Sequence, residues 1–304
     1  MSSWEGVRVT VVGLTPAGFA AADNLMHLGA TVTLLAEEPA TGEDEERAKL
    51  LEVLGATVRT GPGSTADLPV GTDALVLGEE HPLAGAAAGF GLPVWGELDL
   101  AWELRSRESP PWLAVAGERA GRVADHLAAM LRAGGHRTLT CGTGGLPLVE
   151  AAMDPTPYGV LVAALDPAQL HRAGGFAAHS AAVTEATDPV LGRVYEGVEH
   201  ACVYRVEDAA AEDLVREADV VEGARAIGVT LGTPAVGMVG LVDDVLADRA
   251  FIAERQSSAA ELGTLADLSA DEPALLADAL TAAALARAFG VEPVAVRNGL
   301  RTLS

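Results

Sequence analysis

A strand, a glycine turn and a helix follow one another twice in this chain, and this alternation restricts the fold more than any other feature. The first occurrence is VRVTVVG, LTPAGFAAADNLMHLG and ATVTLLA, residues 7–36. The second runs from WLAVAG through RVADHLAAMLRAGG to RTLTCG, within residues 112–142. Apolar strands on either side of a helix are typical of a parallel sheet buried on both faces. The sequence therefore predicts an α/β fold.

The chain has 304 residues, which is enough for two domains of ordinary size. The stretch RSRESPP, residues 105–111, is charged and holds two prolines that no helix would continue through. We expect a Rossmann-like domain with a parallel sheet over residues 1–106, a linker over 107–111, and a second α/β domain over 112–304. A final long helix is expected over residues 271–290, ending at a glycine.

Charge and apolar patterning exclude several classes of partner. The formal net charge of −23 argues against nucleic acid and anionic membranes, because both attract basic surfaces. No apolar run reaches the roughly 18 to 20 residues of a membrane span, and the first residues lack an export signal, so a cytoplasmic protein is expected. Cys141 and Cys202 lie in apparent strands and are expected to be buried thiols. No metal site is expected, because no cluster of His and Cys has ligand spacing.

The first glycine turn, Gly13 to Gly18, lies where a dinucleotide-binding turn would lie. It departs from the dinucleotide pattern, because Thr15 replaces the middle glycine. At the end of the second strand, Ala36 takes the place of the expected acid, with Glu37 just after it. Three interpretations follow: an oxidoreductase site for a nicotinamide cofactor, another phosphate site at the helix N-terminus, or a plain tight turn.

The second glycine turn, Gly117 to Val123, lies where a phosphate loop would lie but lacks its chemistry. Such a loop uses a lysine for the terminal phosphates and a Ser or Thr for Mg²⁺, whereas Lys49 is the only lysine of the whole chain. Glu118 would repel a phosphate by about 4 kcal/mol at about 4 Å and an effective dielectric near 20. Val123 offers no ligand to Mg²⁺. The turn is predicted to be structural, with Arg119 or Arg122 in the lysine's role as the alternative.

The order of several segments along the chain resembles the Mur ligase family, and within it the branch that adds D-glutamate. The segments that carry the resemblance are EEHPLAGAAAGFGLPVWGELDLAWEL, GTGGLPLVEAAMDP, YGVLVAALDPAQLH and LADALTAAALARAFGVEPVAVRNGL. The resemblance implies a UDP-sugar-binding first domain, an ATPase central domain of the P-loop type and a third domain for the amino acid. It also implies amino-acid ligation to UDP-N-acetylmuramoyl-L-alanine through an acyl phosphate.

The resemblance weakens at the positions that the family uses for catalysis. The family's phosphate loop falls on Gly117 to Val123, its Mg²⁺-binding glutamate on Ala164, and its His-Asn pair near Ala274 and Leu275. The segment with the carbamylated lysine is largely missing, and the chain ends where the third domain is expected to begin. We therefore predict a catalytically inactive homologue with no catalytic residue, no metal and no cofactor, ATP and Mg²⁺ binding having been lost. Its degenerate positions are Glu118, Gly121, Arg122, Val123 and Ala164.

The nucleotide site of the first domain is predicted from the same resemblance. The predicted partners are a UDP-N-acetylmuramoyl-type nucleotide and a protein of the cell-wall or division machinery, bound by a scaffold or regulatory protein. The alternative is the two-domain N-terminal part of an active, ATP-dependent D-glutamate ligase. The candidate UDP-sugar residues are Gly13, Leu14, Thr15, Pro16, Ala17, Gly18, Glu37 and Thr143.

Overall fold

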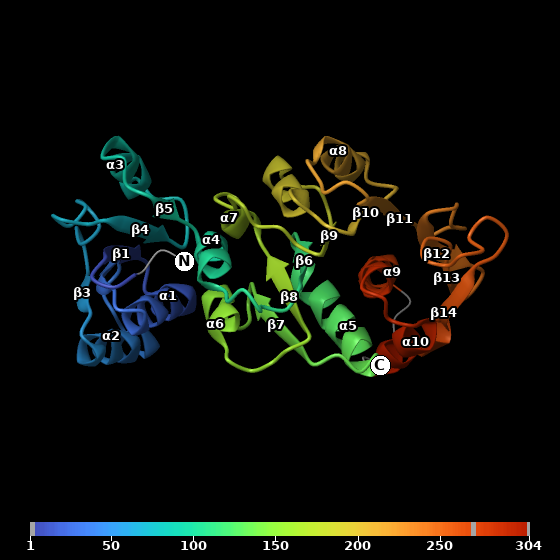
Figure 1. Ribbon diagram of the computed structural model, residues 1–304, viewed down its shortest axis with the longest axis horizontal. Helices are drawn as coiled ribbons and strands as arrows, with labels where there is room; N and C mark the ends of the chain where they lie inside the picture. Colours follow the sequence, from blue (N-terminus) through green and yellow to red (C-terminus); the bar gives the residue numbers. More distant parts are fainter. Residues whose placement is uncertain (1–3, 269–271, 303–304) are drawn as a thin grey trace. The chain divides into compact units, whose positions relative to one another are not determined.

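A computed structural model describes residues 4–268 and 272–302 of the chain. The chain divides into two compact units (Figure 1). Unit 1 comprises residues 1–109, 147–155 and 171–174, and unit 2 comprises residues 110–146, 156–170 and 175–304. Each unit is built on its own sheet with helices, so the α/β class and the two tandem α/β units are confirmed.

The sheet of unit 1 has five strands in the order β3-β2-β1-β4-β5, all of them parallel. The strands are β1 (Arg8–Val12), β2 (Thr31–Ala36), β3 (Thr57–Thr60), β4 (Ala74–Leu77) and β5 (Val94–Trp95). The helices are α1 (Pro16–His27), α2 (Glu43–Leu54), α3 (Leu83–Gly89), α4 (Glu97–Leu104) and α6 (Leu148–Met153). The order reverses at β1, so β1 and β4 lead into loops that diverge at the carboxyl edge of the sheet, where ligands of such folds bind.

The sheet of unit 2 has nine strands in the order β14-β13-β12-β11-β10-β9-β6-β8-β7. It is parallel from β7 to β12 and antiparallel from β12 to β14. The strands are β6 (Trp112–Ala116), β7 (Thr138–Gly142), β8 (Val160–Leu165), β9 (Ser180–Val183), β10 (Ala201–Arg205), β11 (Arg225–Val229), β12 (Met238–Val242), β13 (Val245–Asp248) and β14 (Ala260–Thr264).

The helices of unit 2 bring together segments that are distant in sequence. Helix α5 (Ala120–Ala133) lies beside α9 (Pro273–Ala288) and α10 (Pro293–Arg301), as Figure 1 shows. The remaining helices are α7 (Pro167–Leu170), α8 (Ala209–Glu217) and the 3₁₀ helices η1 (Pro189–Tyr195) and η2 (Leu265–Asp267). The core of unit 2 is formed by the apolar faces of α5, α9 and α10 and the central strands.

The described C-terminal part of unit 2 has two helices where the sequence predicts one. The predicted helix over 271–290 is observed as α9, and residue 271 lies outside the described residues. The segment after it, which the sequence analysis leaves unassigned, forms α10 with Pro293 in its first turn. Proline is well suited to that position because the missing N–H has no acceptor there in any helix.

Candidate functional site

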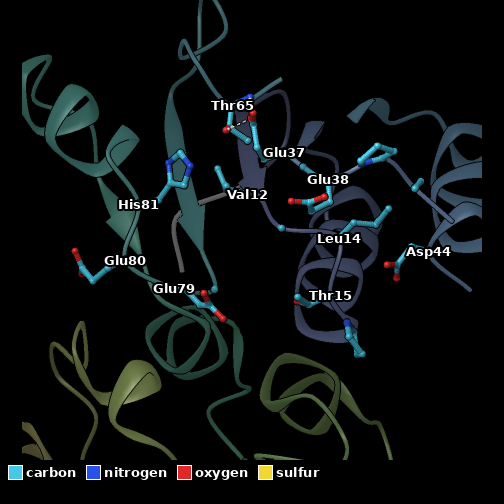
Figure 2. A pocket seen from close by; sticks show the side chains of 16 residues that line it. Val12, Leu14, Thr15, Glu37, Glu38, Asp44, Thr65, Glu79, Glu80 and His81 are labelled. Atoms are coloured by element: carbon cyan, nitrogen blue, oxygen red, sulfur yellow. Dashed lines mark hydrogen bonds between the residues drawn. The ribbon is translucent and has the colours of Figure 1, made fainter. Parts of the chain in front are cut away.

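The carboxyl edge of the unit 1 sheet holds a pocket of about 520 Å³, a size typical of small-molecule sites. It lies over the ends of β1, β2 and β4, where the strand order reverses. Figure 2 shows its labelled side chains. The lining residues are Val12, Gly13, Leu14, Thr15, Pro16, Ala36, Glu37, Glu38, Pro39, Ala40, Asp44, Thr65, Gly78, Glu79, Glu80 and His81.

The first glycine turn places the N-terminus of α1 at this pocket. Thr15 is the N-cap, and its hydroxyl accepts a hydrogen bond from the Gly18 N–H at 3.1 Å. Gly13 has a φ of 105°, and a Cβ on Gly18 would collide with the Gly13 carbonyl oxygen, so both positions require glycine. The turn is therefore compact, and it directs the positive end of the α1 dipole toward the pocket.

Glu37 follows β2 and is held by the loop after β3. Its carboxylate accepts a hydrogen bond from the Gly63 N–H at 2.7 Å. It also accepts one from the Thr65 hydroxyl at 2.7 Å, which Figure 2 shows as a dashed line. The Gly63 N–H, followed by Thr65, lowers the pKa of Glu37 below its ordinary value. Glu37 is therefore an oriented, ionised acceptor beside the pocket.

The lining of the pocket is strongly acidic. Five carboxylates line it, and His81 is the one imidazole among the lining residues. Glu80 pairs with Arg172 at 2.7 Å and with His171 at 3.2 Å, which offsets part of this charge. The His81 Nδ1 accepts from the Leu83 N–H at 3.2 Å, so the neutral ring carries its proton on Nε2 and presents a donor.

The predicted UDP-sugar residues separate into three groups in the structure. Gly13, Leu14, Thr15, Pro16 and Glu37 line the pocket. Ala17 and Gly18 lie in the first turn of α1, behind this lining. Thr143 belongs to unit 2, where its hydroxyl donates to the Gln169 side-chain oxygen at 2.9 Å.

Several lining residues are absent from the candidates of the sequence analysis. Thr65 follows a Gly-Pro-Gly turn with no motif around it, and only the tertiary fold brings it to Glu37. His81 stands in the HPL segment that carries part of the family resemblance, so this segment was the available signal. Asp44 opens α2 within a run of four acids and is indistinguishable there from a solvated helix start.

The second glycine turn forms a closed loop between β6 and α5. The Gly117 N–H donates to the Leu165 carbonyl at 3.1 Å, and the Ala120 N–H donates back to the Gly117 carbonyl at 3.0 Å. Gly117 has a φ of 115°, and a Cβ there would collide with the Thr184 hydroxyl at the end of β9. These amides are used within the protein rather than turned toward a ligand.

The side chains of this loop have different surroundings. Glu118, Gly121 and Arg122 are exposed, whereas Val123 is fully buried in the core. Arg119 is largely buried and forms ion pairs with Glu185 and, at 2.8 Å, with Asp278 of α9. Burial lowers the pKa of Arg119, but hydrogen bonds and charge from Asp278 and Glu185 outweigh it and raise that pKa.

In this conformation two side chains of the loop are engaged within the protein or buried in its core. The Arg119 guanidinium is engaged by two carboxylates, and the Val123 side chain is fully buried. Ala164 is buried within β8, paired with Val115 of β6. Across residues 4–268 and 272–302, no three His, Cys, Asp or Glu side chains form a group that could hold a metal ion. The helices of the same residues include none long and apolar enough to cross a bilayer.

Comparison with known proteins identifies close relatives, although no protein-family profile matches the chain. UDP-N-acetylmuramoylalanine–D-glutamate ligase of Streptomyces avermitilis is 46% identical over 322 residues, covering 99% of this chain and 68% of the relative. The enzyme of the same name from Streptomyces coelicolor is 45% identical over 327 residues, covering 100% and 68%. The chain thus spans about two thirds of the length of these relatives.

Solved structures of Mur ligases share the fold at low sequence identity. UDP-N-acetylmuramate:L-alanyl-gamma-D-glutamyl-meso-diaminopimelate ligase from Neisseria meningitides gives a TM-score of 0.59 at 15% identity, covering 98% of both chains. UDP-N-acetylmuramate-alanine ligase from Thermotoga maritima gives a TM-score of 0.54 at 14% identity, covering 97% of this chain and 68% of that one. These likenesses confirm the Mur ligase fold of the two units.

The expectation that the chain takes no cofactor, with ATP and Mg²⁺ binding lost, is wrong in the light of these relatives. They are ligases, 46% and 45% identical over essentially the whole chain. A ligase couples bond formation to cleavage of a nucleoside triphosphate. The residues of the Gly117 to Val123 loop are therefore not sufficient grounds for excluding ATP and Mg²⁺.

The predicted family resemblance is confirmed, because relatives with at least 39% identity cover nearly all of the chain. The chain belongs to the UDP-N-acetylmuramoylalanine–D-glutamate ligase family of Mur ligases.

Proposed function

We propose that this protein takes part in peptidoglycan precursor synthesis by binding a UDP-N-acetylmuramoyl-type nucleotide in the pocket of unit 1. The observation that carries the proposal is the position of the α1 N-terminus at a pocket of about 520 Å³ on the switch point of a parallel sheet. The names of the relatives contain the same nucleotide sugar.

The pocket offers matching chemistry for the two ends of such a ligand. The positive end of the α1 dipole favours the diphosphate. Glu37 accepts hydrogen bonds and therefore suits the N–H and O–H donors of a uracil or ribose. The carboxylates of Glu38, Asp44 and Glu79 repel a diphosphate, so binding should tighten when salt screens them.

The test is a calorimetric titration with UDP-N-acetylmuramoyl-L-alanine. We expect binding by the unaltered protein and a Kd weakened by at least about tenfold in Ala40→Trp, which fills the pocket. Ala86→Trp is the matched control, because Ala86 is exposed on α3 and outside the lining. Absence of heat with the unaltered protein, or equal weakening by both variants, would reject the site.

A second candidate function is the ligation itself, the joining of D-glutamate to this nucleotide at the expense of ATP. The ligase names of the relatives favour it over the inactive scaffold that the sequence analysis predicts. In this candidate Arg119 or Arg122 takes the role of the missing lysine. ADP release that requires both nucleotide and D-glutamate supports it, and release equal to an enzyme-free blank rejects it. A cytoplasmic location, a protein partner and the domain limits 1–106 and 112–304 stay predictions.

A further inference from the structure

The glycine loop of unit 2 is covered by a cluster of four charged side chains from three separate parts of the chain. Arg119 and Arg122 come from the loop and the start of α5. Glu185 comes from the loop after β9, and Asp278 from the second turn of α9. Two guanidinium groups and two carboxylates sum to zero charge. The cluster therefore neutralises itself without any ligand.

The central pair of this cluster is buried. The Asp278 side chain is only 2% exposed, and that of Arg119 is 17% exposed. The Arg119 Nε donates to the Asp278 Oδ1 at 2.8 Å, while Arg122 approaches the Asp278 Oδ2 at 3.7 Å. Burial excludes competing water, so these contacts hold the arginine side chain far more firmly than a surface pair would.

The cluster nevertheless leaves hydrogen-bonding capacity unused at its centre. Among residues 4–268 and 272–302, neither the Arg119 Nη2 nor the Asp278 Oδ2 has a hydrogen-bond partner, although both atoms are buried. Buried polar atoms without a hydrogen-bond partner are uncommon in proteins, because each such group loses its hydration without compensation. An additional anion oxygen would satisfy the guanidinium N–H.

We propose that Glu185 and Asp278 form an internal latch that occupies Arg119 in place of a phosphate-class anion and keeps the glycine loop closed. Each carboxylate accepts one hydrogen bond from the Arg119 guanidinium, and together they occupy N–H groups that phosphate oxygens could otherwise bind. The Gly117, Ala120 and Val123 amides of the loop meanwhile donate to carbonyls of the protein itself. Opening requires Arg119 to exchange its carboxylate partners for phosphate oxygens. This inference concerns unit 2 and does not rest on nucleotide binding in unit 1.

Removing the latch charge should expose a phosphate site. The probe is inorganic tripolyphosphate without metal, titrated calorimetrically into the unaltered protein and into the double variant Glu185→Gln with Asp278→Asn. We expect the double variant to bind at least about tenfold more tightly, because two charge-assisted contacts to Arg119 are weakened. The control is Glu217→Gln with Glu222→Gln, which removes the same charge from exposed positions of unit 2. It should bind as the unaltered protein does.

The gain in tripolyphosphate affinity must depend on Arg119. Adding Arg119→Ala to the double variant should return the affinity to that of the control. A gain that survives Arg119→Ala, or a double variant that binds no more tightly than the control, overturns the latch. If the double variant fails to fold, Glu185→Gln alone serves, since its carboxylate is 37% exposed and its loss orphans no buried charge. A folded Glu185→Gln protein that binds tripolyphosphate no better than Glu217→Gln also overturns the proposal.

Discussion

At the scale of single residues, the same ion-pair chemistry has different consequences in different surroundings. Asp248 is fully buried and pairs with Arg287 at 2.9 Å, while its Oδ1 accepts from the Ala250 N–H at 2.7 Å. Arg216 forms its pairs with Glu212 and Asp213 on an exposed face of α8. Water screens the exposed pairs but not the buried one, so removing one partner is costly only in the buried pair, where the other charge stays buried and unpaired.

Arg287→Met should therefore destabilise the protein by about 3 to 5 kcal/mol, because it leaves the Asp248 carboxylate buried without its cation. Arg216→Met should leave stability nearly unchanged. Denaturant unfolding monitored by circular dichroism measures both. Equal midpoints for the two variants would show that the Asp248 pair contributes nothing.

His179 introduces a pH dependence of stability. Its ring stacks on His200 at 4.1 Å between centroids and meets the edge of Phe289. Burial, followed by the charge of His200, lowers the pKa of His179 from 6.5 to about 4. Between about pH 6.5 and pH 4, the unfolded chain therefore binds a proton at His179 that the folded chain does not bind.

The stability from His179 should be complete above about pH 6.5 and should decline as the pH falls toward about 4. His179→Phe should flatten this part of the profile, while His27→Gln on the exposed surface of α1 should not. Melting temperatures between pH 7.5 and pH 4 provide the measurement. If the melting temperature of His179→Phe falls with pH as steeply as that of the unaltered protein, other groups cause the pH dependence.

At the scale of elements, close packing between helices decides positions that local sequence leaves open. Helix α10 packs on α5, and a Cβ on Gly299 would lie 2.5 Å from the Met130 Cα. Only a residue without a side chain allows this approach. Gly85 lies in the middle of α3 on its solvent-exposed face, and a Cβ there meets nothing within 4 Å.

Gly299→Ala should consequently destabilise the protein by about 1 to 3 kcal/mol, because overpacking against backbone cannot relax easily. Gly85→Ala should stabilise it by about 0.5 to 1 kcal/mol through helix propensity. Opposite shifts of the melting temperature are expected. A neutral or stabilising Gly299→Ala would contradict the packing of α10 on α5.

At the scale of the whole molecule, unit 1 is not a continuous piece of sequence. Helix α6 comes from residues 148–153, beyond the proline-rich stretch, and packs on α1 and α4. The Leu148 N–H donates to the Glu97 side chain at 2.7 Å, and Leu148 and Val149 are fully buried. The chain thus returns to complete the unit.

A fragment of residues 1–109 should therefore be less stable than unit 1 within the full chain, because it exposes the faces of α1 and α4 that α6 covers. Adding residues 147–155 through a flexible linker should restore part of the loss. Thermal melting and binding of a hydrophobic dye report both effects. A fragment that melts with unit 1 of the full chain would show that α6 is dispensable.

The sequence by itself determined the α/β class, the first βαβ unit, the glycine turn at α1 and the family. These depend on local periodicity, on glycine positions and on motif order, all of which are short-range properties of the chain. It did not reveal α10, because VAVRNGL is short and its helical form depends on packing against α5. The sequence also led to the wrong conclusion that ATP and Mg²⁺ binding is lost, because the absence of motif residues does not establish that a ligase homologue works without them.

Only the tertiary structure decided which distant residues meet. Thr65 reaches Glu37 across 28 positions, and Asp278 reaches Arg119 across 159. Such contacts follow from the order of strands in a sheet and from the helices that cover it, and no periodicity in the chain encodes them. For this reason the turn at Gly117 could be recognised from its residues, whereas the carboxylates that close it became visible only after the chain was folded.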